Sequence, residues 1–179
     1  MIHFLEDGPL KLWIMDRAED GIEGGSASRL GMRWDDFFPP PGGLLDKYAC
    51  WDLPPGWGKA REALGRIAAS SCYAAFAWLD SRPLAMAWIN PIGQASGDLH
   101  FFTSLREPQA VARAGRLFLD AAERRFPSLL CLAPRPLLGA HKLARALGFE
   151  KLAILRGACH MRSRGKVYDG ILYLRRRGS

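Results

Sequence analysis

The chain has 179 residues, 49% of them hydrophobic and 24% charged, a composition typical of one globular domain large enough to bury a core. No apolar run approaches the roughly 20 residues of a membrane span, so we expect no transmembrane segment. Glu6 and Asp7 stand where a secretory signal would be positively charged, so we expect no such signal. The net charge of +7 favours a polyanionic partner, which could be nucleic acid, an acidic protein or a phosphorylated cofactor.

The first part of the chain has the weakest periodicity. Residues 10–15 predict an opening strand. Residues 33–57 combine tryptophans and phenylalanines with prolines and glycines, which predicts an irregular insertion in a single domain spanning 1–179. This insertion could be a packed surface loop, or a lid or wall of a pocket.

From residue 58 the pattern is regular. Residues 59–70 carry an apolar stripe of helical spacing, 72–79 and 83–92 predict an antiparallel pair around a short turn, and 98–104 predict a third strand. The later elements are a helix, a buried strand, a second helix closed by Gly148, and two final strands. Their predicted ranges are 108–126, 129–134, 138–149, 152–159 and 167–174.

The strand-helix-strand order over 98–134 has a topological consequence. A helical crossover joins parallel strands, so we expect strands 98–104 and 129–134 to run parallel in one sheet. The three arginines 175–177 at the end of the chain are interpreted as a solvated tail.

This order resembles the GNAT superfamily of acyl-CoA-dependent N-acetyltransferases. Three stretches carry the resemblance: the strand-to-helix step "DLHFFTS" into "PQAVARAGRLFLDAAERRF", the Gly-Phe step in "AHKLARALGFEKL", and the closing "RGACHMRSRGKVYDGILYLRR". The His100-Phe101 step is similar to short GNAT-like proteins of phages and prophages. The resemblance implies an α/β (α+β) domain with a mixed, mostly antiparallel sheet flanked by helices.

The same resemblance implies acetyl-CoA as co-substrate, bound where the central strand meets the 108–126 helix. In the family a glycine-rich loop brings backbone N–H groups to the pyrophosphate. Here Ala110 and Ala112 stand in that stretch and only Gly115 remains, so weak binding is expected. The arginines could pair with phosphate or simply solvate the helix. The candidate cofactor residues are Phe102, Thr103, Ser104, Arg106, Ala112, Arg113, Gly115 and Arg116.

Two positions depart from the family pattern. Where many members place a tyrosine that protonates the departing thiolate, this sequence has Ala144, and where they place an asparagine it has Leu137. These losses favour a non-catalytic GNAT-like binding or structural module. The retained order of elements favours an N-acetyltransferase acting on a small-molecule or peptide amine.

His100 is the candidate general base, because an imidazole has an unperturbed pKa of about 6.5. Asp98 lies two residues earlier on the same strand face and could orient His100 or act as the base itself. Tyr168 is a candidate proton donor. A histidine in a strand can equally be a hydrogen-bonded core residue, and a strand tyrosine can simply pack.

The four cysteines are widely separated, with no Cys-x-x-Cys pair, so we expect no metal site. Cys72, Cys131 and Cys159 lie in apolar runs, which indicates small buried side chains in a reducing, cytoplasmic compartment. Nucleic-acid binding is disfavoured because no recognition helix or RNA-binding aromatic pair is present. Unpaired edge strands of the sheet would allow a homodimer to form.

Overall fold

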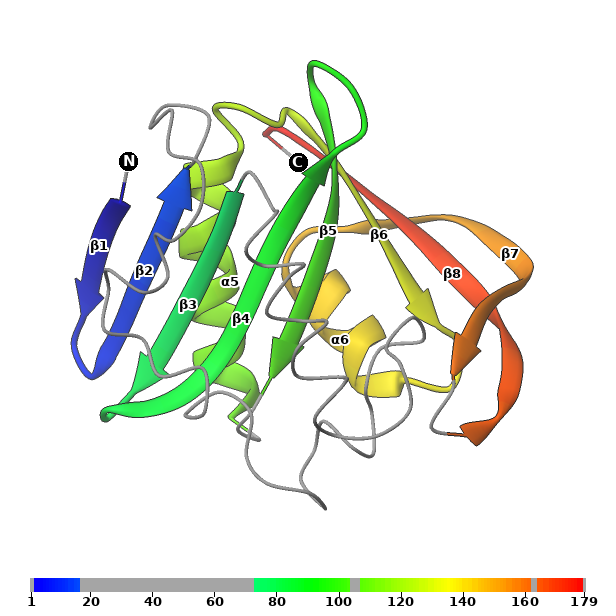
Figure 1. Cartoon of the computed structure of the whole chain (residues 1–179), viewed down its shortest axis with the longest axis horizontal. Coiled ribbons are helices and arrows are strands. Elements are labelled where there is room, and N and C mark those ends of the chain that lie inside the picture. Colours follow the sequence, from blue (N-terminus) through cyan, green and yellow to red (C-terminus); the bar gives the residue numbers. More distant parts are fainter. Residues whose placement is uncertain (1, 17–72, 104–106, 162–163, 179) are drawn as a thin grey trace.

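The computed structural model describes residues 2–16, 73–103, 107–161 and 164–178. These residues form one eight-stranded sheet in the order β1-β2-β3-β4-β5-β6-β8-β7 (Figure 1). Every neighbouring pair is antiparallel except β5 and β6, which run parallel. The predicted mixed, mostly antiparallel sheet and the predicted parallel pair are therefore confirmed.

The strands and helices have the following bounds: β1 (Ile2–Asp7), β2 (Leu10–Asp16), β3 (Tyr73–Leu79), β4 (Arg82–Pro91), β5 (Ser96–Thr103), α5 (Pro108–Ala122), β6 (Ser128–Pro134), α6 (Leu138–Ala146), β7 (Glu150–Met161) and β8 (Lys166–Arg176). The predicted helix at 59–70 and the predicted insertion at 33–57 lie outside the described residues.

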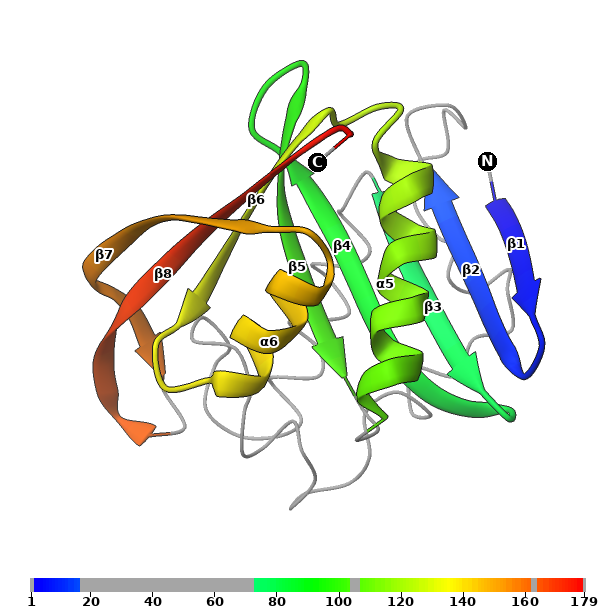
Figure 2. The ribbon, with the colours of Figure 1, turned by 180° about the vertical axis from the view of Figure 1, so that it is seen from behind.

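The two described helices, α5 and α6, lie on the same face of the sheet (Figure 2). The predicted stripe of α5 is buried there: Val111, Ala114 and Phe118 are each at most 7% exposed. They pack against alternate residues of the strands, including Leu12 of β2 and Ala75 of β3. Alternation along β5 then places Leu99 and Phe101 toward the helices and His100 on the other face.

Two predicted boundaries differ from the structure. The strand β1, which the sequence analysis did not identify, pairs with β2 through a turn at Gly8. The helix predicted over 108–126 ends at Ala122, and a turn follows in which the carbonyl of Ala122 accepts from the N–H groups of both Arg125 and Phe126. Phe126 turns into the core and is 2% exposed. None of the described helices is long and apolar enough to cross a membrane.

The interpretation of 175–177 as a solvated tail is wrong for Arg175. Its side chain is 11% exposed and forms an ion pair with Glu123 at 2.5 Å. It also donates to the carbonyl of Leu147 at 2.6 Å. Arg175 therefore ties β8 to the ends of both helices, and only Arg176 and Arg177 are exposed.

Candidate functional site

The parallel strands β5 and β6 separate partway along their length. Their register begins at Ser96 and Ser128 and ends at Asp98 and Leu130, although β5 continues to Thr103 and β6 to Pro134. Figure 1 shows the two strands diverging beyond this point. Strand backbone that loses its neighbour presents N–H and C=O groups that a ligand can bind. We call this divergence the β5–β6 opening.

Gly97 allows the strands to approach at the closed end of the opening. A Cβ atom at this position would lie 2.3 Å from Ile89 Cγ2 and 3.3 Å from Leu129 Cδ2. Real Cβ atoms do not approach carbon that closely, so a side chain here would force β4, β5 and β6 apart. The opening thus starts beside a residue that only glycine fits.

Asp98 and His100 contact each other at the point where the strands separate. His100 Nε2 lies 3.1 Å from Asp98 Oδ2, and the two side chains are 26% and 36% exposed. The sequence analysis placed both on one strand face, and the structure brings them together. Because a carboxylate can only accept, it favours the tautomer with its proton on Nε2. Nδ1 then carries the lone pair and can accept a proton from another molecule.

Trp88 fixes the plane of the His100 ring. It is the cross-strand partner of His100 on β4, and the two rings stack with centroids 5.2 Å apart and planes 8° from parallel. Aromatic pairs of this kind contribute about 0.5–1.5 kcal/mol beyond the area they bury. Trp88 is 3% exposed, and its Nε1 has no hydrogen-bond partner among the described residues. The sequence analysis did not identify Trp88, although cross-strand register would have indicated it.

The predicted cofactor residues of β5 divide between the two faces. Phe102 lies on the His100 face and is 7% exposed. Thr103 faces the helices and lines an apolar cavity with Ala87, Val111 and Phe118. Ser104 and Arg106 lie outside the described residues.

The predicted cofactor residues of α5 have mixed surroundings. Ala112 is 8% exposed, and a Cβ on Gly115 would lie 2.8 Å from Leu147 Cδ2, so this glycine permits α5 to pack on the end of α6. Arg113 forms an ion pair with Asp7 of β1. Arg116 is exposed, forms no hydrogen bond or ion pair with a described residue, and lines a mostly apolar cavity with Pro108.

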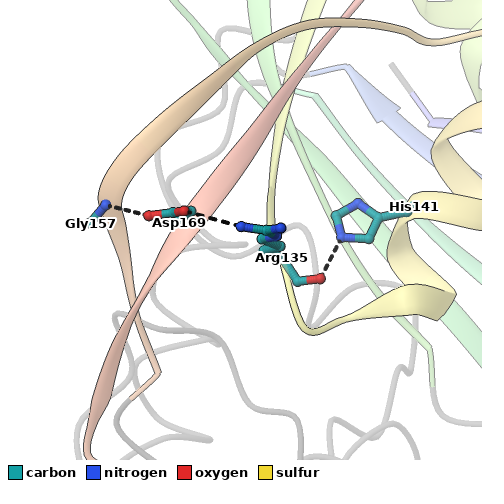
Figure 3. A network of polar contacts seen from close by, with 4 residues as sticks. All are labelled: Arg135, His141, Gly157 and Asp169. Carbon is teal, nitrogen blue, oxygen red and sulfur yellow. Dashed lines mark hydrogen bonds and ion pairs between the residues drawn. The ribbon is translucent and has the colours of Figure 1, made fainter.

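Asp169 of β8 organises the far side of the opening (Figure 3). Its Oδ1 accepts from the backbone N–H of Gly157, which has φ +61 at a bulge in β7, and its Oδ2 lies 3.5 Å from Arg135 Nη1. Its carbonyl accepts from the Arg135 N–H at 2.9 Å. The aspartate of the Tyr168-Asp169 step therefore holds the end of β6 to β7 and β8.

His141 of α6 completes this network. Its Nε2 lies 3.1 Å from the carbonyl oxygen of Arg135, and its Nδ1 lies 3.1 Å from the hydroxyl of Tyr173 (Figure 3 shows the former contact). A carbonyl only accepts, so Nε2 donates to it and Nδ1 accepts from the tyrosine. His141 is 4% exposed and both ring nitrogens are engaged, so it fixes α6 against β6 and β8.

Tyr168 stands apart from His100. It pairs with Cys159 in the β7–β8 ladder and is half-buried, on the opposite face of β8 from Tyr173. No described contact joins Tyr168 to Asp98 or His100. Ala144, at the position of the family's tyrosine, is 2% exposed in the core.

Cys131 lies on β6, which is between β5, the strand of His100, and β8, the strand of Tyr173. Burial, with a smaller contribution from the Asp98 charge, raises the pKa of its thiol to about 12. Cys131 and Cys159 are both free and buried, as predicted. No group of three His, Cys, Asp or Glu that could hold a metal ion occurs in the described part of the chain.

No protein-family model and no curated protein matches the sequence. Solved structures match across nearly the whole chain. A GNAT-family acetyltransferase from Bacillus anthracis has a TM-score of 0.69 at 7% identity, covering 99% of this chain and 100% of its own.

Two further neighbours contain the cofactor. A ribosomal L7/L12 alpha-N-protein acetyltransferase in complex with coenzyme A has a TM-score of 0.69 at 9% identity over 97% of this chain and 98% of its own. An acetyltransferase from Salmonella typhimurium with its cofactor acetyl-CoA has a TM-score of 0.65 at 8% identity over 94% of both chains. At these identities the comparison establishes architecture alone: this chain has the fold of the GNAT acetyltransferases.

Proposed function

We propose that the protein transfers an acetyl group from acetyl-CoA to an amine. The observation that carries the proposal is the Asp98–His100 pair, which lies where β5 and β6 separate. The structural neighbours support it, because acetyltransferases share this fold and two of them hold coenzyme A or acetyl-CoA. His100 acts as the general base, Asp98 orients it, and Trp88 holds its ring.

The reaction requires one proton to leave the incoming amine. In this proposal the proton moves to Nδ1 of His100 as the C–N bond forms, and the Nε2–H of His100 continues to donate to the Asp98 carboxylate. Backbone N–H groups of β5 beyond Asp98 donate to the developing oxyanion. The C–S bond then breaks, and the thiolate takes a proton, for which Tyr168 is the candidate donor. The acetylated amine and free coenzyme A are the products.

The cofactor is proposed to bind at the N-terminal end of α5. Helix N-terminal N–H groups attract phosphate, and the uncommitted Arg116 adds charge at the neighbouring cavity. Phe102, Thr103, Ser104, Arg106, Ala112 and Gly115 complete the proposed contact set. Arg113 would have to leave Asp7 to reach a phosphate. We therefore expect weak binding, with a larger loss for Arg116→Ala than for Arg113→Ala.

Titration with coenzyme A tests this proposal directly. A ligand that binds only the folded state stabilises it by about 2.7 kcal/mol when present at 100-fold over Kd. Calorimetry and thermal unfolding should both respond to coenzyme A, and Arg116→Ala should weaken both responses. Arg124→Ala, an exposed arginine at the other end of the helix, is the matched control. A titration to about 1 mM with neither heat nor a melting shift would reject cofactor binding.

Turnover is tested separately with a panel of small amines and peptides, following release of the free thiol of coenzyme A. Release that depends on the amine supports transfer.

A non-catalytic GNAT-like module, of phage or prophage type, is the second candidate. It is favoured by the burial of Ala144, where many family members place their acid. Cofactor binding without amine-dependent release would favour this module. We also propose a cytoplasmic location, supported by the free buried thiols Cys131 and Cys159.

A further inference from the structure

The positive charge of the protein is concentrated at one end of the chain. Residues 135–179 hold 11 Lys and Arg against two acidic residues, whereas residues 1–134 hold 14 against 16. The net charge of +7 therefore arises entirely from the region of α6, β7 and β8. Such a concentration of one sign attracts a partner of the opposite sign.

Much of this charge lies on the last strand of the sheet. β7 is terminal in the strand order, and seven of its first eight residues are exposed, Ala153 being half-buried. Figures 1 and 2 show the strand curving around the outer edge of the sheet. No described strand pairs with its outer edge, so its N–H and C=O groups there can accept another extended segment.

The same hairpin exposes aliphatic side chains among the charges. Leu152, Ile154 and Leu155 of β7 are 57%, 48% and 38% exposed, and Val167 of β8 is 60% exposed. The exposed cations Lys151 and Arg156 flank the aliphatic residues of β7, and the exposed Lys166 precedes Val167 on β8. We call these seven residues the β7–β8 surface.

Protection of an edge strand explains only part of this surface. Lysines, arginines and bulges are the usual means of preventing edge-to-edge aggregation, and β7 has all three. Exposed aliphatic side chains do the opposite, because they favour association. Their presence beside the charges indicates a surface that binds something.

Two other occupants fit this surface less well. A second copy related by a two-fold axis would place the same cationic residues against themselves. A nucleic acid would satisfy the cations but offers no apolar face for four aliphatic side chains, and its readers use aromatic side chains instead.

We propose that the β7–β8 surface docks an extended, acidic protein segment that carries aliphatic side chains. The segment adds a strand to the outer edge of β7, its carboxylates meet Lys151, Arg156 and Lys166, and its aliphatic residues cover Leu152, Ile154 and Val167. This is β-strand addition with the charge complementarity of the surface setting the choice of partner. The proposal does not depend on acetyl transfer.

Fluorescence anisotropy with designed peptides tests it. The probe is a labelled peptide of alternating Glu and Val, compared with an all-Glu peptide, an alternating Lys and Val peptide, and a single-stranded oligonucleotide. We expect the Glu-Val peptide to bind most tightly, with an affinity that falls as salt rises from about 50 to about 300 mM. Preference for the oligonucleotide, equal binding of the all-Glu peptide, or no binding up to about 1 mM would overturn the proposal.

Variants locate the binding. The double change Lys151→Glu with Arg156→Glu should weaken Glu-Val binding by about tenfold or more, and Ile154→Ser by about threefold to tenfold. Arg124→Glu, an exposed arginine after α5, should change it less than about twofold. Unchanged binding in the double variant, or a dimer that this variant dissociates, would also overturn the proposal. All variants should retain the wild-type melting temperature and response to coenzyme A, which separates this test from that of the proposed function.

Discussion

His100 and His141 occupy two contrasting regions of the molecule. His100 lies on the sheet face opposite α5 and α6, is partly exposed, and has one nitrogen within hydrogen-bond distance of Asp98. His141 lies on the helix α6, is 4% exposed, and has partners for both nitrogens. A histidine can accept a substrate's proton only if one nitrogen is free of a structural bond. This difference supports the proposal that His100 transfers the proton, and it indicates a structural role for His141.

The largest expected effect comes from His100→Ala. Removing a general base lowers turnover by about 10²–10⁴-fold, while coenzyme A affinity should stay unchanged. The acidic limb of the pH profile of turnover should disappear as well. His160→Ala, a change at another exposed histidine, serves as the control and should leave turnover unchanged. A His100→Ala protein that melts several degrees lower yet turns over acetyl-CoA normally would show that His100 stabilises the fold and is not the general base.

Asp98→Asn should have the next largest effect. The carboxylate favours the Nε2–H tautomer, and an amide can instead donate to that nitrogen and favour the wrong one. We expect turnover to fall on the order of 10²-fold with coenzyme A affinity preserved. Asp80→Asn, in the exposed turn between β3 and β4, is the matched control. Equal turnover in both variants would mean that Asp98 does not orient the base.

His141→Ala should act on stability instead of chemistry. It leaves the carbonyl of Arg135 and the hydroxyl of Tyr173 without their partner, at a cost of about 1–3 kcal/mol. For a chain of this size that corresponds to about 2–4 °C of Tm per kcal/mol. Thermal unfolding and a double-mutant cycle with Tyr173→Phe would measure the coupling. Additive losses in that cycle would show that the His141–Tyr173 hydrogen bond contributes nothing.

The smallest effect concerns Cys131. Burial and, to a smaller extent, the charge of Asp98 raise the pKa of its thiol, and its cross-strand partner on β8 is Tyr173. Its pKa of about 12 in the folded state exceeds the ordinary value of 9.0, so the unfolded chain loses this proton first as pH rises. The stabilisation is complete below about pH 9 and is lost progressively above it, by at most about 1.4 kcal/mol per pH unit. The free energy of unfolding of the wild type and of Cys131→Ala, measured between about pH 8 and 10 in steps of about half a pH unit, gives the slope of stability against pH. Identical slopes would contradict the assignment.

From residue 73 onward, the sequence predicted the order of the described elements and the faces that they bury. The helical spacing of Val111, Ala114 and Phe118 located α5, and Gly148 located the end of α6, because apolar periodicity and helix-end chemistry are local properties. Alternation along 98–102 placed Asp98 and His100 on one strand face, and in the structure His100 Nε2 lies 3.1 Å from Asp98 Oδ2. The strand-helix-strand order likewise fixed the parallel pairing of β5 and β6.

The partners of these residues depend on the three-dimensional fold. The stacking of Trp88 on His100 depends on the register of β4 against β5, and the pairing of Arg113 with Asp7 joins positions that are remote in sequence. Arg175 belongs to a run that resembles a solvated tail, yet β8 carries it between the ends of two helices. The sequence pattern suggests that Gly115 belongs to a phosphate-binding loop, whereas in the structure it allows α5 to pack on the end of α6. Long-range contacts select these roles, because charge and side-chain size are encoded locally while proximity is not.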